Sequence, residues 1–166
     1  MSGAGRLLIL GGIALALLGM GYGLWYAVFN EHQELDGIGK SLASGFSAAA
    51  ERNAPAVGAA LEQYREEKYG YDRHVDVHGH WIGLAMLMIV LGFAFERTKF
   101  SDGVRYLLAL SLFLGAFLFP LGVLLQTYSH GPGPRTVAIV GSALVIVSLA
   151  GVALGFVRDR ASSQFG

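Results

Sequence analysis

The stretch LLILGGIALALLGMGYGLWYAVF, residues 7–29, contains no charged side chain and decides the class of protein. A helix needs roughly 20 consecutive apolar residues to cross the hydrocarbon core of a membrane, and this stretch is long enough. It ends in bulky residues and lacks a small-x-small cleavage site, so we interpret it as an uncleaved anchor and not as a signal peptide. The opening of the chain therefore predicts an integral membrane protein.

Three further apolar segments follow, within residues 76–96, 103–127 and 135–158. The chain is 54% hydrophobic and only 14% charged, whereas charged residues make up about 25% of a typical soluble domain. Together with residues 7–29, these segments predict an all-α integral membrane protein. We expect a single membrane domain, residues 1–166, in which four transmembrane helices form an up-down bundle surrounded by the lipid bilayer.

The connection between the first two spans, residues 30–72, carries two amphipathic patterns. Apolar residues recur at three- and four-residue steps, at Leu35, Ile38, Leu42 and Phe46 and then at Val57, Leu61 and Tyr64. Such spacing predicts helices with one apolar face, and Pro55 suits the first turn of the second helix. We therefore expect a helical extracytoplasmic loop of two short helices, separated near residues 53–55. They would dock on the bundle, on the membrane surface or on a partner subunit.

Basic residues are unevenly distributed between the two ends of the predicted spans. One end carries Arg6, Arg97, Lys99, Arg105, Arg158 and Arg160. At the other end the link between the third and fourth spans has only Arg135, and residues 30–72 hold more acidic than basic side chains. Because cytoplasmic segments of membrane proteins are enriched in Lys and Arg, we expect both termini in the cytoplasm. The predicted location is a bacterial-type inner or plasma membrane.

Composition and motifs exclude several classes of function. Cysteine is absent, which rules out disulfides, iron–sulfur clusters and thiolate metal sites. Lys+Arg and Asp+Glu are equal at 12 each and form no basic stripe, so nucleic acid is not an expected partner. No charged or histidine side chain lies in the core of a predicted span, which argues against an ion-coupled transporter.

Two Gly-x-x-x-Gly pairs mark surfaces where helices can approach closely. Gly19 and Gly23 lie in the first span, and Gly151 and Gly155 lie in the fourth. Small residues permit close backbone contact in lipid, where no hydrophobic drive acts between helices. We expect these pairs to pack within the chain, with a homo-oligomer as the alternative.

Four of the five histidines are concentrated at one face of the membrane. His74, His78 and His80 lie where the second span begins, and His130 follows the end of the third span. Because consecutive spans run antiparallel, these positions are expected at similar depth on neighbouring helices. His74 and His78 are four residues apart and share one helix face.

This histidine cluster is compatible with a haem or a metal ion. Two facing imidazoles, His78 or His80 with His130, are typical of bis-histidine haem b held between helices. Copper or zinc would be bound by His74, His78, His80 and His130, with Asp76 as a carboxylate ligand or as a partner that orients a histidine.

A quinone is the third candidate ligand. The same histidines would hydrogen-bond its head group with Tyr128 and Gln126, while Gly79 leaves room for a flat ring. The leading hypothesis is therefore a redox-associated small membrane protein that holds haem b, a metal ion or a quinone at its outer face. The alternative is a cofactor-free structural, accessory or assembly subunit of a larger membrane complex. In that case the histidines join helices through hydrogen bonds. The chain is not expected to be an enzyme on its own.

Overall fold

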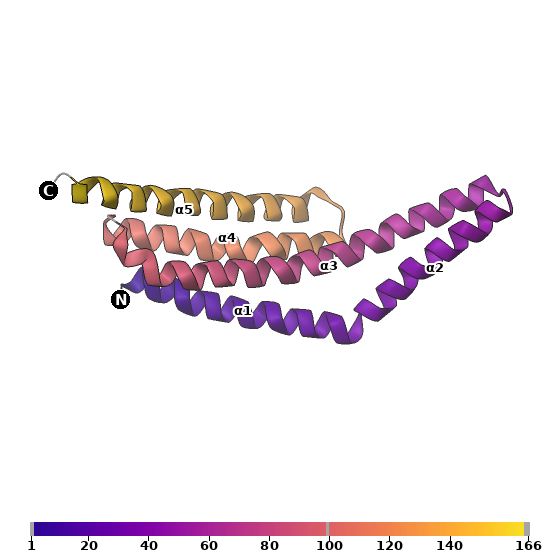
Figure 1. Cartoon of the computed structure of the whole chain (residues 1–166), viewed down its shortest axis with the longest axis horizontal. Coiled ribbons are helices and arrows are strands. Elements are labelled where there is room, and N and C mark those ends of the chain that lie inside the picture. Colours follow the sequence, from indigo (N-terminus) through magenta and orange to yellow (C-terminus); the bar gives the residue numbers. More distant parts are fainter. Residues whose placement is uncertain (1, 99, 165–166) are drawn as a thin grey trace.

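The chain is helical almost throughout in the computed structural model (Figure 1). The structure describes residues 2–98 and 100–164, with side chains described up to residue 157. Lys99 and the side chains of Arg158 and Arg160, which the predicted orientation uses, therefore lie outside the described part of the chain. The elements are α1 (Gly3–Phe29), α2 (Glu31–Ala50), α3 (Ala54–Ala94), the 3-10 helix η1 (Phe95–Arg97), α4 (Asp102–Tyr128) and α5 (Pro132–Gln164). No strand occurs among the described residues, which confirms the all-α prediction.

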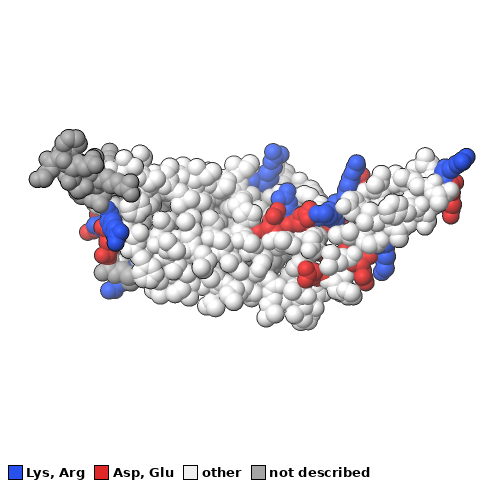
Figure 2. Space-filling model, in the orientation of Figure 1, with Lys and Arg blue, Asp and Glu red and all other residues white. Residues whose placement is uncertain are grey.

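Four helices are long and apolar enough to cross a membrane, as predicted. They are Gly3–Phe29, Ala54–Arg97, Asp102–Tyr128 and Pro132–Val157. Figure 2 shows, on the face drawn, a belt of the bundle without charged side chains. On α3 the belt lies between Asp76 and Glu96, and a rise of 1.5 Å per residue gives it a length of about 30 Å, the thickness of a hydrocarbon core. We therefore take residues 77–94 as the membrane-spanning part of α3, and His74 lies outside it.

The bundle is built on three helices, with the fourth at the edge. α1, α3 and α4 contact one another, whereas α5 packs mainly on α4 (Figure 1). Leu8, Val77, Met88 and Leu112 are fully buried in the shared core. Consecutive spans run in opposite directions, so α1 begins and α5 ends on one side of the belt. We call this the terminal side and the opposite side the hairpin side.

Beyond the belt, α2 and the first half of α3 form an antiparallel hairpin, residues 31–75 (Figure 1). Its tip lies between Ala50 and Ala54, close to the predicted break near residues 53–55. Arg52 takes a left-handed conformation, with φ 57°, as residues that end helices often do. The Asn53 side chain then accepts from the Ala56 N–H and caps the start of α3.

The second half of the hairpin and the second span form one helix. The sequence patterns predict a short helix followed by a span that begins near residue 76, but α3 runs without interruption from Ala54 to Ala94. Side-chain pairs about one turn apart support the intervening part, joining Gln63 to Glu67, Lys68 to Asp72 and Arg73 to Asp76. Such pairs stabilise a helix, and the glycine at position 70 costs only about 1 kcal/mol. The span therefore continues into the hairpin without a hinge.

The predicted glycine pairs make contacts within the chain. A Cβ added to Gly19 would lie 3.0 Å from the Cβ of Trp81, and one added to Gly23 would meet the His78 ring. In α5, Gly151 packs on Leu108 and Gly155 packs on Thr98 and Phe100. Both pairs therefore contact other helices of the same chain, as expected.

The contact between α4 and α5 involves glycines that the pattern did not single out. A Cβ on Gly141 would lie 2.3 Å from the backbone nitrogen of Phe119, and one on Gly122 would lie 2.3 Å from the backbone nitrogen of Ala138. Neither distance leaves space for a side chain. The two helices therefore pack backbone against backbone, as small residues allow in lipid.

Gly141→Ala should destabilise the bundle, because its methyl group would force α5 away from α4. Overpacking of this kind costs about 1–3 kcal/mol. The matched control is Gly21→Ala in α1, where an added Cβ has nothing within 4 Å. Thermal unfolding of the purified proteins in one detergent should give a lower midpoint for Gly141→Ala only, and equal midpoints would contradict the close packing.

Candidate functional site

His74 is buried where three helices meet. Its Nδ1 shares a hydrogen bond with the Tyr22 hydroxyl of α1, and its Nε2 lies 3.6 Å from a carboxylate oxygen of Glu34 on α2. The Tyr26 hydroxyl donates to the other oxygen of Glu34 at 2.6 Å. The Tyr26 ring also stacks on the imidazole, with centroids 4.8 Å apart. We call Tyr22, Tyr26, Glu34 and His74 the elbow cluster, because they join α1, α2 and α3 where α1 gives way to α2.

Burial controls the charge of the elbow cluster. Removal from water lowers the pKa of His74, and the nearby Glu34 carboxylate opposes this shift only in part. The neutral imidazole is therefore favoured, and each of its nitrogens already faces a partner. This arrangement holds helices together and leaves no open position on His74 for a ligand.

His78 joins α3 to α1 one turn deeper. Its Nδ1 lies 2.9 Å from the carbonyl oxygen of Gly19, and because a carbonyl only accepts, Nδ1 carries the proton. A Cβ on Gly23 would lie 2.2 Å from the same Nδ1, so the imidazole occupies the space between the two glycines. His74 and His78 share a face as predicted, but that face meets α1 and not α4.

His80 points to a different neighbour. Its Nδ1 donates to the carbonyl oxygen of Asp76 on its own helix at 2.6 Å. Its ring meets the Phe119 ring of α4 in a T-shaped contact, with centroids 4.7 Å apart. His80 is therefore the histidine of α3 that faces the third span.

His130 and its predicted helpers lie farther out. The His130 ring is 5.5 Å from the ring of Tyr69, about three turns of α3 beyond His80, or roughly 16 Å along the helix. Gln126 donates to the Gly122 carbonyl at 3.1 Å and accepts from the Tyr69 hydroxyl at 3.4 Å. Tyr128 is 73% exposed, and among the described residues no hydrogen bond or ring contact joins it to the histidines of α3.

The structure does not bring the predicted ligands of a metal or haem together. Two imidazoles on one ion need their nitrogens within about 4 Å of each other, since each metal–nitrogen bond is about 2 Å long. His80 and His130 are much farther apart than this, and His74 and His78 face α1 instead. Within the described residues, no group of three or more His, Asp or Glu side chains is arranged to hold a metal ion.

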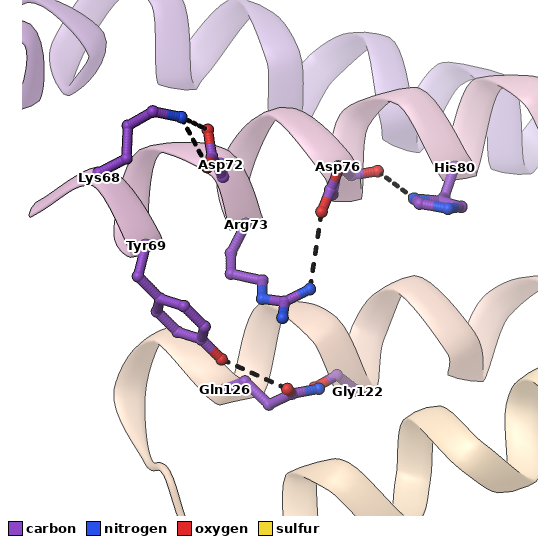
Figure 3. Close-up of polar contacts among 8 residues, drawn as sticks. All are labelled: Lys68, Tyr69, Asp72, Arg73, Asp76, His80, Gly122 and Gln126. Carbon is purple, nitrogen blue, oxygen red and sulfur yellow. Dashed lines mark hydrogen bonds and ion pairs between the residues drawn. The ribbon is translucent and has the colours of Figure 1, made fainter. Parts of the chain in front are cut away.

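A line of polar contacts follows α3 on the hairpin side of the belt (Figure 3). Lys68 donates to both carboxylate oxygens of Asp72 at 2.5 and 2.7 Å, and this bond raises the pKa of Lys68. Arg73 lies 3.6 Å from Asp76 and covers the ring of Tyr69 at 4.8 Å. Charges in this line therefore compensate one another.

Three members of the elbow cluster were not among the predicted site residues. No local pattern marks Tyr22 and Tyr26 within the first apolar stretch, and Glu34 is one of several acidic residues in the connection that follows it. The signal that would have found them is the antiparallel pairing of α1 with α3. Once Gly23 is set against His78, the next turn of α1 places Tyr26 beside His74.

Comparison with known proteins gives no relative from which a function could be inferred, so the functional argument rests on the residues described above. No protein-family model, curated protein or solved structure matches the chain.

His74→Ala should loosen the elbow, because it leaves the partly buried Tyr22 hydroxyl and the Glu34 carboxylate each short of a partner. An unsatisfied buried polar group costs about 1–3 kcal/mol. His32→Ala is the matched control, since His32 is 89% exposed and lies 3.8 Å from Asp36 in a surface pair of little energetic value. The thermal midpoint should fall, and trypsin should cut the hairpin faster, in His74→Ala only. An equal response of the two variants would contradict the role of the cluster.

Proposed function

We propose that the chain is a small accessory or assembly subunit of a membrane complex that binds a partner through its hairpin. The observation that carries this proposal is an apolar groove near the hairpin tip, outside the uncharged belt. The groove has a volume of about 210 Å³, and its lining is apolar apart from a serine and a tyrosine. It is lined by Ser41, Leu42, Gly45, Phe46, Ala49, Val57, Ala60, Leu61 and Tyr64.

Large apolar side chains stand exposed beside this groove. Phe46 is 74% exposed, Leu61 48% and Leu42 39%. Gly45 and Ala60 face each other between α2 and α3, and a Cβ added to Gly45 would lie at an ordinary contact distance, 3.6 Å, from that of Ala60. Exposed apolar side chains around a concave floor are typical of an interaction site and not of a solvent-facing hairpin.

The occupant that fits is an amphipathic helix of a partner subunit. The groove runs between two helices, and its large side chains recur at four-residue steps, as Leu42 and Phe46 do on α2. A third helix would complete a three-helix bundle and would place apolar residues of every turn in the groove. Figure 2 shows both signs of charge along the hairpin, which does not favour a strongly charged partner.

Lipid of the same membrane is too far away to fill the groove. The helical rise of 1.5 Å per residue places Phe46 about 24 Å beyond Asn30, where α1 ends. Figure 1 shows α2 continuing away from the bundle and not turning along its end. A protein partner that stands out from the membrane can reach this height.

The redox-associated hypothesis has less geometric support. Haem b or a metal ion held by His78, His80 and His130 would need these side chains to converge, and instead they contact α1, α4 and Tyr69 respectively. The contacts of the histidines agree better with the accessory-subunit alternative, in which hydrogen bonds lock helices together.

A photo-crosslinking amino acid in the groove tests the proposal. Leu42 and Leu61 are replaced in turn by p-benzoylphenylalanine, and Ser44, which is exposed on another face of α2, serves as the control position. Irradiation of native membranes should give one discrete adduct from the groove positions. The adduct should disappear when Phe46→Asp is added. Mass spectrometry should identify the partner, and the purified partner mixed with the purified chain, with Phe46 intact, should give the same adduct.

Other crosslinked products would point to a different occupant of the groove. A product of twice the chain mass would assign the groove to a second copy, and lipid adducts alone would mean that the hairpin lies on a membrane. Equal crosslinking from Ser44 and the groove positions would overturn the docking proposal.

We also propose that the hairpin is extracytoplasmic, which the distribution of Lys and Arg favours. Because the chain contains no cysteine, Ser44→Cys introduces a single thiol. A membrane-impermeant maleimide added to intact cells should label it fully, whereas labelling only after permeabilisation would reverse the orientation. Ser2→Cys on the terminal side should behave in the opposite way.

A further inference from the structure

A shallow, open groove lies along α3 at the edge of the uncharged belt, well separated from the hairpin groove. It has a volume of about 320 Å³ and is lined by Val75, Asp76, Gly79 and His80 of α3. It is open at the surface of the helix, where Val75 is 45% exposed. Because Asp76 marks the hairpin-side limit of the belt, this groove lies at the level where a lipid-soluble molecule would place its polar head group.

The orientation of His80 defines what this groove can recognise. Its Nδ1–H donates to the Asp76 carbonyl oxygen at 2.6 Å, a bond within one helix (Figure 3). In the neutral imidazole the other nitrogen, Nε2, then carries a lone pair and acts as an acceptor. Nε2 makes no hydrogen bond within the part of the chain that the structure describes. Because His80 lines the groove, its Nε2 is the acceptor that the groove can offer to a ligand.

The remaining walls favour a neutral, flat molecule. The Asp76 carboxylate is already compensated by Arg73 at 3.6 Å, so the groove offers no free charge. Gly79 carries no side chain, and an added Cβ would have nothing within 4 Å, so a ring can approach the backbone there. The T-shaped contact with Phe119 holds the imidazole plane in place.

We infer that this groove binds the hydroxylated aromatic head group of a lipid-soluble quinol, with a quinol hydroxyl donating to Nε2 of His80. The reduced form is favoured because a quinone has only carbonyl acceptors and would face the lone pair of Nε2. The same hydrogen bond is available to any lipid with a free hydroxyl, such as a diacylglycerol, but only an aromatic ring would also lie flat in the open space beside Gly79. This binding site does not rest on the proposed role of the hairpin.

The test is equilibrium dialysis of the full chain in lipid nanodiscs at pH 8, with empty nanodiscs as the blank. The probes are decylubiquinol, decylubiquinone and a short-chain diacylglycerol. Quinol should bind about tenfold more tightly than quinone, the ratio expected for one hydrogen bond. Diacylglycerol should bind more weakly than quinol.

Two variants and one control locate the binding. His80→Phe keeps an aromatic ring against Phe119 but removes the acceptor, so quinol affinity should fall about tenfold, to the level of quinone. Gly79→Ile fills the groove from an exposed position and should abolish binding of both. His32→Phe should change nothing.

Any of the following results would overturn the inference. Quinone binding as tight as quinol, or quinol binding unchanged by His80→Phe, would show that Nε2 is not the recognising atom. Diacylglycerol binding as tight as quinol would make the groove a general site for hydroxyl lipids. Should His80→Phe fail to elute as a folded species, quinol binding retained by Gly79→Ile would exclude this groove.

Discussion

The contact between α1 and α3 is the constraint on which the hairpin side of the molecule depends. Helices in lipid gain little by burying apolar surface against each other, so a specific register must come from close packing and polar pairs. His78 supplies the polar pair by donating to the Gly19 carbonyl, and the missing side chain of Gly23 supplies the space. With that register fixed, the next turn of α1 places the Tyr26 ring against the His74 ring.

The position of the hairpin follows from the same contact. Glu34 is the residue of α2 that reaches the elbow cluster, where it meets both Tyr26 and His74. Because α3 is continuous from the belt to the tip, α2 is held at one end by this cluster and along its length by packing on α3. A hairpin attached in this way cannot swing freely on a flexible loop. Its apolar groove is therefore presented at a fixed height and direction, which suits the docking role that we propose for it.

Local features of the sequence were enough to predict the spans and the hairpin tip. The length of an apolar stretch and the signals at Asn53 and Pro55 depend on neighbours in the chain, so no knowledge of tertiary structure was needed. The continuity of α3 was missed because charged residues between the loop pattern and the span resemble a linker. They are in fact good helix formers, and their pairs at a spacing of three or four residues favour one long helix.

Partners of the histidines could not be predicted in the same way. A four-residue step correctly places His74 and His78 on one face, but periodicity does not say which neighbouring helix that face meets. The assumption that consecutive spans share the site directed them toward His130, whereas in the structure His78 contacts glycines of α1 and His74 contacts Tyr26 of α1. Glu34 lay beyond prediction because its role depends on the angle at which α2 leaves α1.

His78 and His80 differ in use although both donate from Nδ1 to a backbone carbonyl. The acceptor for His78 belongs to another helix, so its bond is an interhelical contact and its ring fills the space beside Gly23. The acceptor for His80 is four residues back on the same helix, so α3 alone fixes its tautomer and direction. A histidine whose tautomer is set locally needs no second helix to stay an acceptor, and its free nitrogen can face a groove at no cost to packing. This difference assigns His78 to the architecture and leaves His80 as the histidine of α3 with chemistry to offer.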